Sequence, residues 1–376
     1  MRGQVDPHGE LFHTFNLEEL VPTAHPLRAI KARSDRILKE MSPRFSRAYG
    51  KTGRPSVPPE RLIKALLLQA LYSIRSEIQL CEQMGYNMLF RWFLDLSPSD
   101  GVWTPEVFSM NRKRFDEHRF VRDFFDRVVA DAILEGLASE DHFSVDGTLI
   151  QSFASTKSLR PIKSRDQKVS DGSDDDDPGN PTVNFRGEKR GNRTHRSIVD
   201  PEARLARKGR GKPALLSHSA HVLMENRHGL CLDVAVDEAN GYCERVQART
   251  MLTRTHGCHG LWPRTLGGDG GYKDGTFLAD LERDGIIPHI PVPDGPIRGD
   301  DERTAARRRA RRRKKTKGHA ISQRIRKRVE ELIGWCKTVG GLARARFVGR
   351  WKLKQQGEVT AAAYNLLRMA RLAPTV

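Results

Sequence analysis

The order of strands and helices in the second half of the sequence most restricts the fold. From Leu215 onward, alternating apolar runs predict two strands, His218–Glu225 and Leu230–Val236, joined by a turn at Asn226–Gly229. A helix, a strand, a second helix and a proline-containing edge strand are predicted next, at 244–254, 264–269, 276–284 and 286–292. Together with an apolar strand at 143–145 and a helix at 322–339, this order predicts a mixed α/β sheet flanked by helices.

The first 135 residues predict an all-α domain, which leaves 136–376 for the α/β domain. Apolar residues at helical spacing follow Pro58, and further helical segments are predicted at 27–38, 74–84, 88–94 and 105–125. This domain is either a helical packing unit with solvated charges or a DNA-end-binding unit, in which Arg112 and Lys113 lie on a charged face.

The charge of the chain indicates its partner. Lys and Arg number 65 against 47 Asp and Glu, which gives a formal net charge of +18 and favours nucleic acid or an anionic membrane. No apolar run approaches the roughly 20 residues that span a bilayer, and the first residues lack the apolar core of a signal peptide. Nucleic acid is therefore the expected partner. Five scattered cysteines suit a reducing cytosol, and the cluster His256-Gly-Cys258-His259 is interpreted as a solvated loop.

Two polar segments interrupt this pattern. Residues 157–214 are rich in charge, Gly and Pro and predict a long, partly disordered insertion, whose basic pieces either follow a phosphate backbone or form a solvated loop. The basic tract 307–317 has nine Lys or Arg in eleven positions. Such a density of like charge is unfolded on its own, and it favours a nucleic-acid contact over a solvated loop.

Three acidic residues are candidates for the chemistry. Asp146 and Asp269 each end an apolar strand beside glycines, which let backbone or substrate approach closely, and Glu330 lies on a helix with basic neighbours. Carboxylates gathered in a basic protein suit two divalent cations that act on a phosphodiester. On spacing alone this is weak, because a chain with 47 acids offers many triples and most acids are caps or surface charges.

The segment Arg326-x3-Glu330-x6-Lys337 resembles the helix motif Tyr-x2-Arg-x3-Glu-x6-Lys of the DDE transposases of bacterial insertion sequences, in their fourth and fifth families, with Gln323 in place of the tyrosine. Val145–Thr148 and Leu266–Tyr272 look like the two catalytic aspartate segments of that group. Many relatives carry a basic residue at position 270 or 271, whereas this chain has Gly270 and Gly271. The resemblance covers nearly the whole chain and is closest to the fifth family.

The resemblance implies an RNase H-like catalytic domain in which Asp146, Asp269 and Glu330 are both catalytic residues and ligands of two Mg²⁺ or Mn²⁺ ions. The spacing selects Glu330 over Glu331, which points about 100° further round the helix. Arg326 and Lys337 are expected to contact DNA near the cut end. The wider set expected to bind DNA comprises Arg112, Lys113, Arg311, Arg312, Arg313, Lys314 and Lys315.

The implied function is that of a transposase. Such an enzyme binds the terminal inverted repeats of an insertion sequence, frees a 3′-hydroxyl by metal-dependent cleavage and joins it to target DNA. It acts as a homodimer or higher oligomer on paired ends, in the bacterial cytoplasm at the nucleoid. Two alternatives remain open: another RNase H-like nuclease, such as a junction resolvase, or a catalytically inactive DNA-binding protein derived from a transposase. Gly270, Gly271 and Gln323 are the features that fit a loss of activity.

Overall fold

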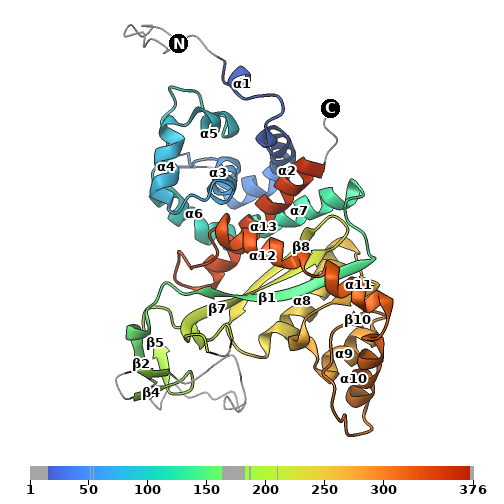
Figure 1. Ribbon diagram of the computed structural model, residues 1–376. Coiled ribbons are helices and arrows are strands. Elements are labelled where there is room, and N and C mark those ends of the chain that lie inside the picture. The colour runs from blue at the N-terminus through green and yellow to red at the C-terminus, as the bar shows by residue number, and fades with distance from the viewer. Residues whose placement is uncertain are drawn as a thin grey trace, which may run out of the picture.

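The computed structural model describes residues 16–372, apart from Lys51, Arg54, 163–182, 186–187 and Arg210. The second half of the described chain folds around a six-stranded mixed sheet in the order β10-β9-β1-β7-β6, with β8 also paired to β7 (Figure 1). The strands are β1 (His142–Gln151), β6 (Arg204–Ala206), β7 (Leu215–Glu225), β8 (Leu230–Glu238), β9 (Thr265–Gly267) and β10 (Ile287–His289). The predicted mixed sheet is thus confirmed, and β10 is an edge strand as its proline suggested.

The strands that surround the site run in both directions. β7 pairs antiparallel with both β1 and β8, whereas β1, β9 and β10 are parallel to one another. Nearly every residue of β7 is buried, as expected for a central strand covered on both faces. Helices α8 (Cys243–His259) and α13 (Arg350–Leu372) pack against β8, and α12 (Arg328–Thr338) packs against β1.

A set of helices precedes the sheet. Their bounds are α1 (Leu17–Leu20), α2 (Pro26–Ala48), α3 (Pro59–Leu71), α4 (Glu77–Tyr86), α5 (Met88–Phe93), α6 (Pro105–Glu117) and α7 (Phe120–Leu134). Although α13 comes last in the chain, it packs against α2, α3 and α7 as well as β8. The helical region and the sheet therefore share one continuous hydrophobic core. None of the helices that the structure describes is both long and apolar enough to cross a membrane.

A buried ion network joins the helical region to the sheet. Asp233 of β8 is fully buried, and Nη1 of Arg122 in α7 lies 2.6 Å from its Oδ1. Arg254 of α8 donates to the same carboxylate from Nε at 2.7 Å and from Nη2 at 2.8 Å. Because the carboxylate has lost its water, these charge-assisted bonds are what stabilise its ionised form.

Three local predictions were wrong. The helix predicted at 322–339 is two helices, α11 (Lys317–Ile325) and α12, because i→i+3 bonds from Val329 and Glu330 tighten the backbone at Arg326 and Lys327 into a 3₁₀-like turn. The helix predicted at 105–125 is divided between α6 and α7 at Arg119, which adopts φ +54°. Residues 256–259 form the last turn of α8 and not a loop.

The basic tract is helical over most of its length, where the charge density predicted no helix. It lies in α10 (Glu302–Arg313) and in the turn before α11. Asp301 caps α10 by accepting a bond from the Thr304 N–H at 2.9 Å. Glu282 of α9 (Gly275–Arg283) pairs with Arg309 and Arg313. These anions offset the repulsion between neighbouring arginines.

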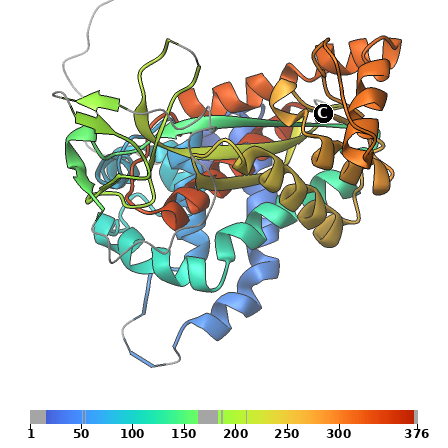
Figure 2. The same cartoon turned by 90° about the horizontal axis from the view of Figure 1, so that it is seen from below.

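The 157–214 insertion contains short strands in its described part: β2 (Leu159–Pro161), β3 (Val183–Phe185), β4 (Glu188–Arg190), β5 (His195–Ser197) and β6. β2 pairs with β5 over a small apolar cluster that includes Leu159, Leu205 and Leu216. The insertion and α9–α10 lie at opposite ends of the sheet (Figure 2). The predicted partial disorder stays a prediction, since 163–182 and 186–187 lie outside the described residues.

Candidate active site

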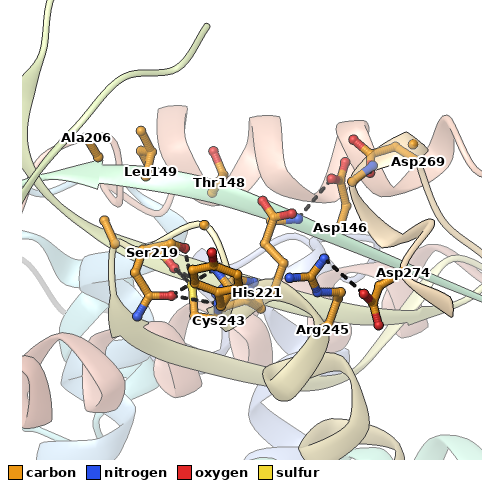
Figure 3. A pocket seen from close by; sticks show the side chains of 18 of the residues that line it. Asp146, Thr148, Leu149, Ala206, Ser219, His221, Cys243, Arg245, Asp269 and Asp274 are labelled. Carbon is orange, nitrogen blue, oxygen red and sulfur yellow. Dashed lines mark hydrogen bonds and ion pairs between the residues drawn. The ribbon is translucent and has the colours of Figure 1, made fainter. Parts of the chain in front are cut away.

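The register of two parallel strands brings Asp146 and Asp269 together. Ser144 of β1 is paired with Gly267 of β9, and each aspartate lies two residues further along its chain. Oδ1 of Asp146 accepts a bond from the Gly147 N–H at 2.8 Å, and Oδ1 of Asp269 accepts one from the Gly271 N–H at 2.8 Å. Figure 3 shows the two side chains as neighbours beside β1. β1 continues five residues beyond Asp146, so this acid does not end its strand as predicted.

Glu330 reaches the same region from the first turn of α12, where the positive end of the helix dipole favours a carboxylate. Its side chain is exposed, with 62% of its surface accessible. Arg326 lies between the two acids: its Nη1 is 3.7 Å from Oδ2 of Asp146, and its Nη2 is 3.9 Å from Oε1 of Glu330. The structure thus places Glu330 across an arginine from Asp146.

Burial and like charge change the acidity of Asp146. Burial is the largest influence and raises its pKa to about 6, assisted by repulsion from Asp269 and Glu330. The Gly147 N–H and the Arg326 guanidinium act in the opposite direction. A carboxyl group in this position gains from a nearby cation, which would remove the repulsion.

A cavity of about 780 Å³ opens beside Asp146 and Asp269. Glu244, in the first turn of α8, lines it together with both aspartates, whereas Glu330 lies outside its lining. The pKa of Glu244 is raised by burial and by repulsion from Asp269 and Asp146. The cationic side chains on the cavity wall are Arg207, Lys208, Arg245, Lys273 and Arg307.

Sequence reasoning did not identify Glu244 as a site residue. An acid in the first turn of a helix is ordinarily explained by the helix dipole, so the sequence offered no reason to single it out. Gly271 points to Glu244 only once the structure is known, because a Cβ there would lie 3.0 Å from an oxygen of Asp269 and 3.0 Å from Oε2 of Glu244.

The donor set suits hard divalent cations. Carboxylate oxygens are the ligands that Mg²⁺ and Mn²⁺ prefer, and Gly271 leaves a space between two of them that a Cβ would fill. Within the described chain, no three or more His, Cys, Asp or Glu side chains are already close enough to hold an ion. An ion at this site would require the carboxylates to lie closer together than they do here.

Gln323, at the tyrosine position of the motif, has a structural role in this chain. Its amide nitrogen donates to the Gly268 carbonyl at 3.2 Å and to the His289 carbonyl at 2.6 Å. It thereby fastens α11 to the ends of β9 and β10, close to Asp269.

The basic residues expected to bind DNA differ in their environments. Lys337 is half-buried, and burial followed by repulsion from Lys208 lowers its pKa. Lys113 is exposed. Arg112 is buried, paired with Glu77 and stacked over the Phe347 ring at 4.0 Å, so its role is internal and does not include the DNA contact expected from the sequence.

The side chains of the basic tract 307–317 also divide into internal and solvent-exposed ones. Arg313 is paired with Glu282, and Arg311 donates to the Pro293 carbonyl at 2.7 Å. Lys314 is exposed and 3.2 Å from Asp294. Arg312 and Lys315 are exposed. Part of the tract therefore stabilises the fold, and part faces solvent.

Two family models match the chain. Residues 15–114 match the family described as Transposase domain (DUF772), and residues 182–366 match the family described as Transposase DDE domain. The second range includes Asp269 and Glu330, and Asp146 lies between the two ranges. No significant match was found among curated proteins or among solved structures.

Proposed function

Because the chain belongs to the DDE transposases of insertion sequences and has their RNase H-like fold, we propose that it binds the terminal inverted repeats of an element, cuts the DNA there and joins the freed 3′-hydroxyl to target DNA. The observation that carries this proposal is the strand register that brings Asp146 and Asp269 side by side, with Glu330 facing them across Arg326.

Asp146, Asp269 and Glu330 are the residues that would hold the divalent cations. When bound, two Mg²⁺ or Mn²⁺ ions would activate the attacking water or 3′-hydroxyl and stabilise the leaving oxygen of the phosphodiester. The chain itself fixes the positions of the carboxylates: backbone N–H groups orient both aspartates, and Gln323 anchors the helix that leads to Glu330.

Arg326 contacts carboxylates in this structure and is proposed to contact a DNA phosphate during the reaction. In the structure it partly neutralises Asp146 and Glu330. Once cations take over that task, its guanidinium is free to bind a phosphate of the DNA end, which a planar cation does well.

Further DNA contacts are assigned to the half-buried Lys337 and to exposed cations. Lys337 and Lys208 repel one another, and a phosphate between them would remove that repulsion. Arg312, Lys314, Lys315 and Lys113 extend the basic surface. Since members of this group act on paired ends, the proposed assembly is a homodimer or higher oligomer.

Strand transfer is the experiment that tests the proposal. With Mg²⁺ and pre-cut element ends, the chain should join 3′-hydroxyls to a target plasmid, and Asp146→Asn should abolish both cleavage and joining while end binding persists. Cleavage without joining would favour a resolvase-like nuclease. Salt-sensitive end binding without any Mg²⁺-dependent reaction would favour an inactive, transposase-derived DNA-binding protein.

A further inference from the structure

Glu244 occupies the space between the two backbone segments that carry the aspartates. Its Oε1 lies 3.3 Å from the position that a Cβ on Gly147 would take, and its Oε2 lies 3.0 Å from the corresponding position on Gly271. Gly147 directly follows Asp146, and Gly271 is the second residue after Asp269. The carboxylate thus extends from α8 into the gap beside both acids.

No residue that the structure describes forms a hydrogen bond or ion pair with the Glu244 carboxylate. The charge of the adjacent Arg245 offsets part of the repulsion, but its Nη1 lies 4.0 Å from Asp274 and its guanidinium lies over the Tyr242 ring. A half-buried carboxylate beside two others is unfavourable without a cation. A positive ligand bound there would relieve the repulsion among the three carboxylates.

A second polar group faces the same space. The fully buried His221 holds Ser219 with its Nε2 at 2.7 Å, while its Nδ1 has no hydrogen-bond partner in the described structure. That Nδ1 lies 3.1 Å from the Gly147 Cβ position that Glu244 also approaches. Because Nε2 already contacts Ser219 and Cys243, Nδ1 is the ring nitrogen left to bind a group in this space.

We propose that Glu244 is a fourth carboxylate ligand of the divalent cations, acting beside Asp146 and Asp269 in a space that the unpartnered Nδ1 of His221 also faces. This inference rests on the proposed function, because it concerns the same cations. It also accounts for the departure from the family pattern at position 271, since any side chain there would crowd Glu244 and Asp269. Position 270 has no such restriction, because its nearest neighbour would be the Pro291 carbonyl at 4.0 Å.

Mn²⁺ titration of the full chain without DNA tests the proposal, followed by electron paramagnetic resonance or calorimetry. Glu244→Gln should weaken Mn²⁺ binding by about tenfold or more. The matched control Glu331→Gln, an exposed acid next to Glu330, should bind as the unsubstituted chain does. Unchanged affinity in Glu244→Gln together with weakened affinity in Asp146→Asn would overturn the assignment of Glu244 alone. Unchanged Mn²⁺ affinity in both Glu244→Gln and Asp146→Asn would instead contradict the proposed metal-dependent function.

Thermal unfolding separates lost binding from lost folding. Without metal, Glu244→Gln should unfold at the same or a higher temperature, because the substitution removes an unpartnered charge. With excess Mn²⁺, the unsubstituted chain should gain more stability than the variant, since stabilisation of the folded state grows with the logarithm of the ligand's affinity. Glu244→Asp keeps the charge but shortens the side chain, and it should show the same deficit. Equal Mn²⁺-induced gains in all three proteins would contradict the proposal.

Discussion

Arg326 and Asp146 face one another at the candidate site, with Nη1 of the arginine 3.7 Å from Oδ2 of the aspartate. A cation that binds the carboxylates competes with this guanidinium. Arg326→Gln should therefore tighten Mn²⁺ binding in the absence of DNA by about fivefold, equivalent to roughly 1 kcal/mol for one unit charge at such a distance in water. The same variant should bind element ends more weakly. The slope of log affinity against log salt concentration should fall by about one.

Calorimetry with Mn²⁺ and end-binding measurements at several salt concentrations check both effects of Arg326→Gln. Weaker Mn²⁺ binding in the variant would mean that the guanidinium assembles the metal site and does not compete for it.

The basic tract should separate into DNA-binding and fold-stabilising arginines. Replacing the exposed Arg312 and Lys315 with Ala should reduce the slope of log affinity against log salt by about two, because each lost phosphate contact removes about 0.9 from it. Arg313→Ala should leave that slope unchanged and lower the unfolding temperature, since its partner is Glu282. Fluorescence anisotropy with an element-end duplex gives the slope. An equal change of slope in both proteins would show that the division is wrong.

Asp233 should be among the most sensitive positions for stability. Asp233→Ala leaves the buried Arg122 with Asp126 as its remaining carboxylate partner and takes the carboxylate away from Arg254, at an expected cost of roughly 3–5 kcal/mol. Asp141→Ala is a suitable control, because its contact with Arg264 is exposed and contributes about 0–1 kcal/mol. Urea unfolding measures both. If Asp233→Ala lowered the free energy of unfolding less than Asp141→Ala does, the network would not be what holds the helical region to the sheet.

Glu358 should make stability depend on pH. Burial raises its pKa from 4.5 to about 7, and Oε1 has no partner among the described residues. The folded chain therefore holds a proton on this group that the unfolded chain loses. The associated stability is fully present below pH 4.5 and is lost as the pH rises to about 7, by about 3 kcal/mol at most.

Substituting Glu358 with Gln should remove this dependence. Glu358→Gln should be more stable than the unsubstituted chain at pH 8 and should differ little from it at pH 4.5. Denaturant unfolding across that range provides the measurement, with the exposed Glu331→Gln as the reference. A constant difference at every pH would show that Glu358 does not titrate differently in the folded chain.

The sequence predicted the strands beside the aspartates because their apolar runs and flanking glycines are local features. It could not show that Ser144 pairs with Gly267, which is the reason that Asp146 and Asp269 meet. It also missed the burial of Arg112, because the partner Glu77 is 35 positions away. The helical state of the basic tract was missed for the same reason, since the stabilising Glu282 lies on another helix.

The position of α13 also has a consequence for the order of folding. This helix fills the groove among α2, α3 and α7, yet it lies at residues 350–372. During synthesis, the apolar surface of the amino-terminal helices that α13 covers stays exposed to water until α13 has left the ribosome. The amino-terminal helices therefore complete their packing only after residues 350–372 have been synthesised.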